Sequence, residues 1–529
     1  MRGRMSRVLG ILLVLCVGPQ LLPQNNTCGW TTLSLGAGSG VRALKVWDDG
    51  SGPALYAGTI FQQPGMQGAH GVKWDGNAWT PMGSGLNHFI FCFAVFDDGT
   101  GPALYAGGAF TRFGGIPNGA PYGSGVPVYG VARWDGSSWA PVGNGLSRPS
   151  PFLPGPASGQ VTWLGVFDDG TGPALYAHGG FTQSGSVSLP NMAKWDGVSW
   201  SPPPAAMTAG AGVPDKVLGV FDLGAGPELY AADTDLPGVI RKWDGTAWVP
   251  LGAGVSGLSG APYPPHISTA TVFDDGTGPA LYVGGAFDQA GNVQANGIAK
   301  WDGTSWSALG SGLGFGQNNN VSVDNIFTLK VHDDGSGPAL IAGGVFQLVA
   351  SNIMKWDGTS WSGLDGGLAK PIMALETYDD GTGPALYAGA GAPFSTARDN
   401  VGRWACSPSL VLGLSQTEAI AGGGDVYVSN ENLIPGLEYY NIFSLDVCPG
   451  GPGTGPYGGL CFSTGNLSFL INQLALPLGS IPIHFTAPAG GTTTFGPYTM
   501  PPMTIEGLCV EISAGAINRL SEVTRFTIH

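Results

Sequence analysis

Two short phrases alternate along most of this sequence, and they constrain the fold more than any other feature. The first reads Asp-Asp-Gly-Ser/Thr-Gly-Pro-Ala-Leu-Tyr, and the second reads Trp-Asp-Gly-x-x-Trp. Repetition of this kind is typical of proteins that stack one supersecondary unit many times. The first phrase begins at Asp48, Asp97, Asp168, Asp222 (a degraded copy), Asp274, Asp333 and Asp379, and the second at Trp74, Trp134, Trp195, Trp243, Trp301, Trp356 and, broken off, at Trp404.

Each repeat predicts four short strands separated by turns. In the second repeat these strands are expected at 93–96, 103–108, 130–134 and 139–143. Asp-Gly between apolar runs is a strong hairpin signal, because both residues tolerate the backbone angles of tight turns. Four-stranded units repeated around an axis form a propeller. We therefore predict an all-β fold, with a seven-bladed β-propeller over 28–406.

The two ends of the repeat region predict how the ring closes. The last repeat stops at Cys406, before its fourth strand, while 30–38 near the N-terminus match the fourth strands of other repeats. We expect this N-terminal strand to complete the last blade. Cys28 and Cys406 would then take two positions that are adjacent in sequence in the unbroken repeats, where the Cα atoms are about 3.8 Å apart. We predict a disulfide between them, which an exported protein permits.

The N-terminal segment predicts export. Arg2, Arg4 and Arg7 precede an apolar run over 8–17, the order found in signal peptides, and we assign 1–24 to one without fixing its end. The run is too short to span a bilayer, and no second run is long enough. The net charge of −15, without clustered Lys and Arg, argues against nucleic-acid partners. We expect a secreted or cell-surface protein, without a membrane span once the signal is removed, that is a monomer.

The repeat pattern resembles kelch-type propellers, which have a Gly doublet after an apolar strand and a Trp on a later strand. The pairing of Leu-Tyr-Ala-Gly-Gly-x-Phe with Ala-Lys/Arg-Trp-Asp-Gly-x-x-Trp is more similar still to repeats of fungal cortical cell-polarity markers and of large secreted bacterial proteins. The resemblance covers about 28–406 and implies a surface or extracellular propeller that binds something. It implies no shared catalytic residues, and the Asp-Asp-Gly-Thr-Gly-Pro turn departs from the usual kelch pattern.

After Cys406 the repeat ends, and 407–529 predict a separate β-rich domain. Apolar segments at 425–428, 481–485 and 524–528 alternate with Gly/Pro turns, which favours a β-sandwich-like fold. Cys448 and Cys461 bracket a Gly/Pro-rich loop and form a second candidate disulfide. On position alone, this domain is a candidate for attachment or sorting.

The sequence contains no motif that marks a catalytic or metal centre. It lacks Gly-x-Ser-x-Gly, and its seven histidines have no metal-ligand spacing. His178 is the most suggestive, because it replaces a Gly before a Gly doublet, although a structural role is the simpler reading. The Asp-Asp-Gly turns could offer calcium two carboxylates each, but a plain hairpin turn is favoured. The copper oxidases found on kelch-type propellers need a cross-linked Cys and Tyr, and nothing around Cys92 matches.

Strand parity predicts where a ligand would bind. Both repeated turns lie on one face of the ring, so the two remaining connections, which vary in length and content, share the opposite face, where binding residues usually occur. We predict a non-catalytic binding protein for a glycan or protein, needing no cofactor; the alternative is a secreted carbohydrate-active enzyme or oxidase with its site on the axis. The candidate ligand-binding residues, which could instead cap the core, are Phe113, Tyr122, Phe152, Tyr263, His266 and Phe315.

Overall fold

The structure is a computed structural model, and it divides the chain into two compact units, one of Gly29–Ala405 and one that includes Cys406–His529. Each unit is described by itself. The described residues of the first unit, with Cys28 and Cys406, are 28–33, 35, 40–59, 70–114, 125–149, 156–208, 214–233, 238–257, 265–313, 325–346, 352–364, 366–368, 370–391 and 401–406; those of the second are 411–416, 424–431, 438–444, 473, 484–488, 492–500, 503–513, 516–520 and 524–528.

The repeats fold into four-stranded sheets of the kind that form propeller blades, seven of them within the described residues. Each sheet takes its strands from one repeat, except the last, which takes its fourth strand from the N-terminus. The sheets are β2 (Val41–Asp48), β3 (Pro53–Thr59), β4 (Gly71–Trp74) and β5 (Trp79–Pro81); β6 (Ile90–Asp97), β7 (Pro102–Gly108), β10 (Val131–Trp134) and β11 (Trp139–Pro141); β14 (Val161–Asp168), β15 (Pro173–Gly179), β18 (Met192–Trp195) and β19 (Trp200–Ser201); β20 (Lys216–Asp222), β21 (Pro227–Ala232), β22 (Ile240–Trp243) and β23 (Trp248–Pro250); β25 (His266–Asp274), β26 (Pro279–Ala286), β29 (Ile298–Trp301) and β30 (Trp306–Ala308); β31 (Asn325–Asp333), β32 (Pro338–Val345), β33 (Ile353–Trp356) and β34 (Trp361–Gly363); and β35 (Ile372–Asp379), β36 (Pro384–Ala390), β37 (Val401–Cys406) and β1 (Cys28–Thr32).

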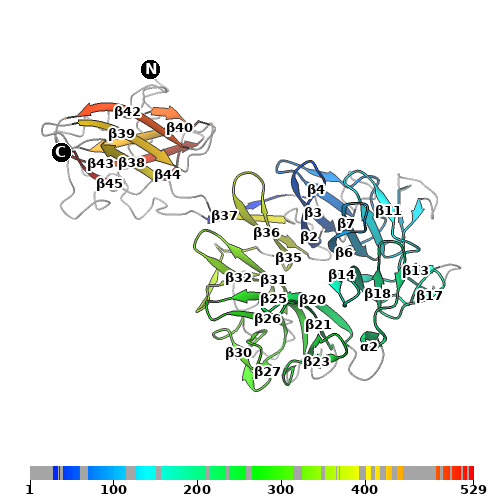
Figure 1. Ribbon diagram of the computed structural model, residues 1–529. Helices are drawn as coiled ribbons and strands as arrows, with labels where there is room; N and C mark the ends of the chain where they lie inside the picture. The colour runs from blue at the N-terminus through cyan, green and yellow to red at the C-terminus, as the bar shows by residue number, and fades with distance from the viewer. Residues whose placement is uncertain are drawn as a thin grey trace. The chain divides into compact units, whose positions relative to one another are not determined.

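The first strands of the seven sheets form the inner wall of a ring. Each first strand contacts the first strand of the next repeat, in the order β2, β6, β14, β20, β25, β31 and β35, and β35 contacts β2 again. Figure 1 shows these strands around the centre, with the later strands of each sheet outside them. The connections that enter the first strands therefore meet at one end of the central axis.

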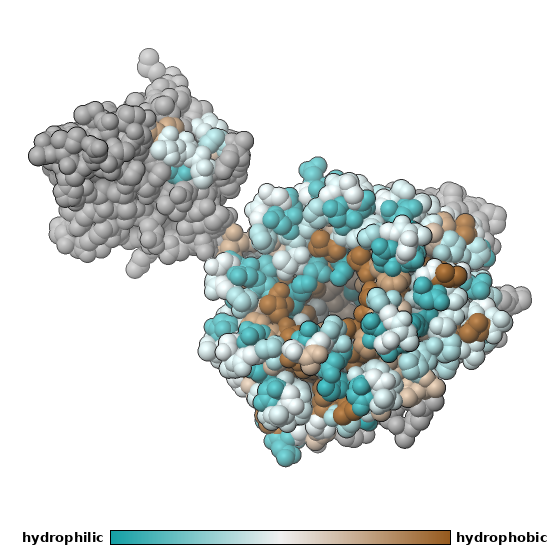
Figure 2. Space-filling model, in the orientation of Figure 1, coloured by the Kyte–Doolittle hydropathy of each residue, from teal (hydrophilic) through white to brown (hydrophobic). Residues whose placement is uncertain are grey.

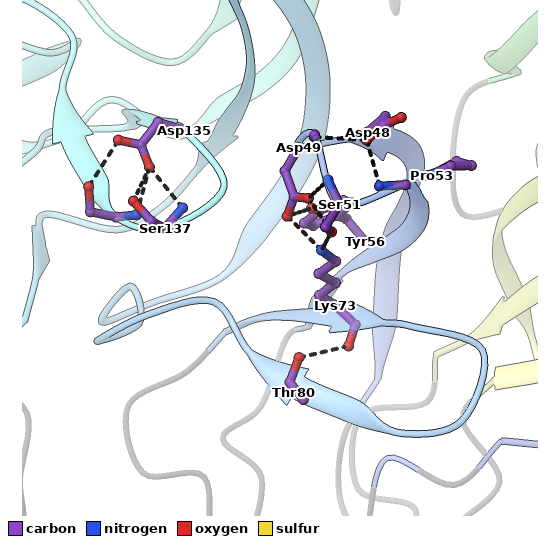
Figure 3. Close-up of polar contacts among 12 residues, drawn as sticks. Asp48, Asp49, Ser51, Pro53, Tyr56, Lys73, Thr80, Asp135 and Ser137 are labelled. Atoms are coloured by element: carbon purple, nitrogen blue, oxygen red, sulfur yellow. Dashed lines mark hydrogen bonds and ion pairs between the residues drawn. The ribbon is translucent and has the colours of Figure 1, made fainter.

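The Asp-Asp-Gly turn is held by its own carboxylates. The Asp48 carboxylate accepts hydrogen bonds from the backbone N–H groups of Gly50 and Gly52, and both glycines have positive φ angles, of 92° and 106°. Asp49 accepts hydrogen bonds from the Tyr56 hydroxyl at 3.0 Å and from the Lys73 ammonium at 2.5 Å (Figure 3). The turn therefore ties the first three strands of its sheet together, and Gly is required where a side chain would strain the backbone.

Tryptophans join neighbouring sheets. The paired rings of Trp134 and Trp139 lie 5.2 Å apart, and both residues are buried. The Trp139 indole N–H donates to the Met82 carbonyl of the preceding repeat at 2.8 Å. The second Trp of the repeat phrase thus buries apolar area and satisfies a backbone acceptor across the sheet boundary.

The closing sheet reproduces this pattern with residues from the two ends of the chain. β1 is the neighbour of β37, and the N–H of Leu33 donates to the Val401 carbonyl at 2.8 Å. A disulfide joins Cys28 to Cys406, with Cα atoms 3.8 Å apart. The stray N-terminal strand therefore supplies the strand that the last repeat lacks.

The longer connections carry small sheets and one short helix, α2 (Ala205–Thr208). These connections belong to the face opposite the Asp-Asp-Gly turns, because they follow the second and fourth strands of each repeat. The small sheets are β8 (Arg112–Phe113) with β9 (Val126–Pro127); β12 (Ser147–Pro149), β13 (Pro156–Ser158), β16 (Gln183–Ser184) and β17 (Val187–Ser188); and β24 (Val255–Ser256), β27 (Gln289–Ala290) and β28 (Val293–Gln294).

The second unit is also built from β-strands. Tyr439, Asn441 and Cys509 are buried within it, while Cys448 and Cys461 lie outside the described residues. No helix in the described part of the chain is long and apolar enough to cross a membrane. One sheet contains β38 (Val411–Gln416), β39 (Gly424–Glu431) and β42 (Thr493–Met500), and the other contains β40 (Glu438–Ser444), β41 (His484–Thr486), β43 (Met503–Ser513), β44 (Ala516–Leu520) and β45 (Thr524–Ile528).

Candidate functional site

A β-bulge near the start of the first strand recurs around the ring. In β2 the pairing with β3 skips Arg42, which lies between Val41 and Ala43, and five other first strands skip the equivalent residue. In β20 the irregularity falls at Leu218 instead, and Lys216 is the sequence equivalent of Arg42. Bulges re-aim side chains, which makes this a suitable place for function. The seven equivalent residues, which we call the axial mouth, are Arg42, Phe91, Thr162, Lys216, Ser268, Phe327 and Met373.

Residue type at the axial mouth differs from repeat to repeat, whereas the two turn phrases of the repeats are nearly uniform. The preceding position is a buried Val or Ile in six repeats, for example Val41 and Ile90. The mouth position itself ranges from cationic to aromatic to small and polar. The packing of a repeat therefore does not dictate this residue. Figure 2 shows a hollow at the centre of the ring with hydrophilic and hydrophobic residues around it.

Arg42 contributes a positive charge that no acid neutralises among the residues that the structure describes. Its guanidinium lies 5.2 Å from the centre of the Phe91 ring, on the next first strand, in a cation–π contact. The surrounding strands bury the guanidinium enough to lower the pKa of Arg42, although the side chain as a whole stays exposed. This combination fits a residue at the wall of an open channel.

Lys216 contributes the second positive charge of the mouth. Its ammonium donates to the carbonyl oxygens of Ile267 and Ser268 on the neighbouring first strand, at 3.2 and 2.9 Å. Burial, followed by the positive charge of Arg42, lowers the pKa of Lys216 to about 8, against a smaller raising effect of Asp215. Because β2 and β20 are not neighbours in the ring, Arg42 and Lys216 influence each other across its centre.

A polar network extends from the mouth into β25 and β31. The Ser268 hydroxyl donates to the side-chain oxygen of Asn325 at 3.1 Å, and the Asn325 amide nitrogen lies 3.1 Å from Nε2 of His266. Asn325 is buried, and His266 is half-buried. His266, a candidate from the sequence, thus lies at the start of a first strand and next to a residue of the mouth.

His178 lies near the same end of the axis. Its side chain is only 7% exposed, and within the described residues its Nδ1 has no hydrogen-bond partner. Burial lowers the pKa of His178 to about 4, and smaller effects of Asp215 and Lys216 show that it lies close to both. At neutral pH this imidazole is therefore uncharged and can offer a ring nitrogen as donor or acceptor.

Aromatic rings continue outward from Arg42 and Phe91. The rings of Phe89 and Phe91 lie 6.2 Å apart, Phe89 and His88 lie 4.0 Å apart, and His88 stacks on His70 at 6.2 Å. His88 is exposed, and both Phe side chains are half-buried. We call His88, Phe89 and Phe91 the aromatic track. It leads from the axial mouth toward the connection between the first two repeats.

Apart from the aspartates that end them, the first strands contain more cationic than acidic side chains, whereas the chain as a whole has a negative net charge. Besides those aspartates they contain Arg42, Lys45, Lys216 and Lys330 but one acidic residue, Glu376, which pairs with Lys330. The complete chain has a net charge of −15. Charge of one sign inside a concave site raises the local concentration of oppositely charged ligands. The axis is therefore electrostatically suited to anions.

The carboxylates of the repeated turns serve the fold. Asp49 pairs with Lys73 (Figure 3). The equivalent acids Asp98 and Asp169 pair with Arg133 and Lys194. In the part of the chain that the structure describes, no group of three or more His, Cys, Asp or Glu residues is placed to hold a metal ion. The ionisable groups at or beside the mouth are instead two cations, the histidines His178 and His266, and Asp215, which precedes Lys216.

The loop candidates from the sequence contribute little to the described site. Phe113 lies on β8, half-buried against the core beneath its own loop. Sequence reasoning missed Arg42, Phe91 and Lys216, although their position at the start of the first strand of each repeat could have drawn attention to them. Four of the candidates lie outside the described residues: Tyr122, Phe152, Tyr263 and Phe315.

Comparison with known proteins finds little similarity in sequence. No protein-family model matches the chain, and no curated protein matches it. Among solved structures, the extracellular domain of a putative hybrid two-component system from B. thetaiotaomicron is similar, at 10% identity and a TM-score of 0.41, over 94% of this chain. The chain spans 57% of that protein's length. The fold described above follows from the strand pairings of the chain itself.

Proposed function

We propose that this chain is an exported, non-catalytic binding protein whose kelch-like, seven-bladed β-propeller holds a glycan or protein ligand at the axial mouth. The observation that carries the proposal is the asymmetry of the mouth. Its residues differ in charge and size from repeat to repeat: six occupy the same bulge position, among them Arg42 and Phe91, and Lys216 is their sequence equivalent in β20.

The mouth has the properties of a ligand site on a rigid frame. Its residues lie on first strands that each pair with the second strand of their sheet and contact the first strands of the neighbouring sheets. Rigid elements position binding groups more accurately than loops do. The aromatic track offers flat apolar faces next to charged and amide groups, a combination that sugars and peptides both use.

Export of the protein is part of the same proposal. The basic and apolar order of the N-terminus is that of a signal peptide, and a Cys28–Cys406 disulfide is stable outside the reducing cytosol. The C-terminal unit, with its two described sheets, is proposed to be a β-sandwich-like domain for attachment or sorting. The ring would act as a monomer, because its sheet edges are short.

A glycan array probed with the mature protein tests this function. We expect binding to a restricted group of glycans, and we expect Phe91→Ala to abolish it because the variant removes the aromatic floor next to Arg42. Phe113→Ala is the matched control, since Phe113 lies beneath a peripheral loop. Binding that survives Phe91→Ala but is lost in Phe113→Ala would place the ligand on the loops and contradict the proposal.

A secreted carbohydrate-active enzyme is a second candidate, favoured by one observation. An amine with a pKa of about 8, as in Lys216, can act as a general base near neutral pH. In a uronate lyase, the base removes the proton at C5, the C4–O bond breaks as a C4=C5 double bond forms, and the departing oxygen takes a proton. Unsaturated product that appears with wild type but not with Lys216→Gln would favour this activity over binding alone.

A further inference from the structure

Most cations of the ring are already neutralised by acids, which makes the exceptions informative. Of the Lys and Arg residues described in the first unit, nine pair with a carboxylate. Lys45, Arg112, Arg148, Arg42 and Lys216 are outside these pairs, and of these Arg42 and Lys216 lie at the axial mouth, where burial lowers their pKa. The pairs are Lys73–Asp49, Arg133–Asp98, Lys194–Asp169, Arg241–Asp233, Lys242–Glu228, Lys300–Asp275, Lys330–Glu376, Lys355–Asp334 and Arg403–Asp380.

Arg42 and Lys216 belong to first strands, β2 and β20, that are not neighbours in the ring. Arg42 starts the first repeat and Lys216 starts the fourth, so the charge of one acts on the other through the mouth rather than through a shared sheet. Two like charges that share a concave site repel each other. An anion between them would remove this repulsion and gain two charge-assisted hydrogen bonds.

We propose that the axial mouth binds the carboxylate of an acidic sugar, held between the guanidinium of Arg42 and the ammonium of Lys216. This inference rests on the proposed function and names the ligand class of the same site. Arg42 supplies a planar pair of N–H donors, which matches the two oxygens of a carboxylate. Lys216 uses two of its three N–H donors on backbone carbonyls, so one remains for the ligand.

The groups around the two cations fit a sugar that carries the carboxylate. Phe91 lies beside Arg42 and Phe89 follows it, so the apolar face of a pyranose ring can stack next to the bound anion. On the Lys216 side, Ser268 and Asn325 provide hydroxyl and amide groups for sugar hydroxyls. A sugar with a carboxylate, an apolar ring face and hydroxyl groups could therefore contact the residues on both sides of the mouth.

Isothermal titration calorimetry of the full mature chain tests the inference. The probes are trisaccharides of D-galacturonate, D-glucuronate and D-mannuronate, each compared with its neutral methyl ester, and inorganic phosphate. We expect one of the acids to bind at least about 10-fold more tightly than its ester, since a charged hydrogen bond contributes about 1.5 to 3 kcal/mol. Arg42→Gln and Lys216→Gln should each lose that preference, while Lys216→Arg should keep it.

Arg148→Gln is the matched control, because it removes the same charge from an exposed position on β12, away from the first strands. Its affinities should equal those of wild type. Equal binding of acid and ester, undiminished binding of the acid by Arg42→Gln, or binding of phosphate in place of the uronates would each overturn the inference. If no uronate binds but neutral glycans bind on the array, the inferred carboxylate site is wrong and the proposed binding function stands. If no glycan binds on the array, the proposal of a glycan ligand is itself contradicted.

Discussion

The indole N–H of Trp30 donates a hydrogen bond of 2.9 Å to the carbonyl oxygen of Leu364, which lies 334 residues further along the chain. Trp139 and Trp200 make the same bond to Met82 and Val142 of the repeats before them. Trp30 therefore takes the place of the second repeat-phrase Trp in the closing sheet. The two ends of the ring are joined by the same interaction that joins its interior sheets.

Gly402 makes room for this closure, and replacing it should open the ring. A Cβ atom at Gly402 would lie 2.7 Å from Trp30 and 2.9 Å from Leu368. We expect Gly402→Val to destabilise the ring by about 1 to 3 kcal/mol, the usual cost of overpacking. Thermal unfolding measures the effect. Gly363→Ala is the control, because a Cβ there meets nothing within 4 Å, and equal stability of both variants would contradict a packed Trp30.

Loss of the Cys28–Cys406 disulfide should weaken the ring without preventing its formation. The bond joins residues 378 positions apart, so it restricts the unfolded chain strongly, and we expect the double Ser variant to lose about 2 to 4 kcal/mol of stability. Denaturant unfolding with and without a reductant measures this. Reductant should lower the stability of wild type to that of the variant; a wild type that is insensitive to reductant would show that the bond adds nothing.

The turn carboxylates should give the ring resistance to acid. Burial raises the pKa of Asp49, but hydrogen bonds from Lys73, Ser51 and Tyr56 outweigh burial and lower the pKa to about 2. A carboxylate with a lowered pKa stabilises the folded state above its unfolded pKa, and that contribution is lost as the pH falls toward 2. Lys73→Met should move the loss to higher pH, as measured by acid unfolding. An unchanged midpoint, equal to that of Arg148→Met, would contradict this role.

Binding of an acidic ligand should weaken as the pH rises through 8. The pKa of Lys216 is lowered to about 8, so the ammonium that attracts the anion is lost above that pH. Asp215, Arg42 and His178 share its surroundings, but His178 has a pKa of about 4 and stays neutral throughout this range. Affinity measured between pH 6 and about 10 should fall in wild type and stay level in Lys216→Arg, because arginine remains charged. A parallel fall in both proteins would assign the titration to another group.

The same lysine should affect stability in the opposite direction. Its folded pKa lies below its ordinary value, so the unfolded chain binds a proton that the folded chain has released between those two values. Stability from this group therefore rises with pH above about 8. Lys216→Met should remove that rise, which urea unfolding at several pH values would show.

The repeat made the ring wall predictable from the sequence. Hairpin turns, paired Trp residues and the stray strand at Trp30 all follow from local phrases that recur, and the broken repeat at Cys406 identifies its missing strand. Local sequence and global fold agree at these positions, as is typical of sequences that specify one structure. The disulfide pair followed from the same alignment of repeats.

The proposed binding site was harder to predict, because it depends on geometry that no local pattern encodes. Arg42 and Lys216 lie 174 positions apart in sequence, and only a closed ring with bulged first strands brings them to one centre. The search for aromatic residues in loops selected Phe113, but this residue packs against the core. It passed over Phe91, because a residue within an apolar strand is expected to be interior. His266, the other described candidate, begins the first strand β25, and its role in binding stays a prediction.

The most direct test of the account is hydrogen exchange of the mature protein with and without its tightest-binding glycan. The account predicts that the ligand protects amides at the starts of the first strands, around Arg42, Phe91, Lys216 and Ser268, and leaves the Asp-Asp-Gly turns unchanged. Protection confined to the Asp-Asp-Gly turns or to the C-terminal unit, with no change at the axial mouth, would contradict it.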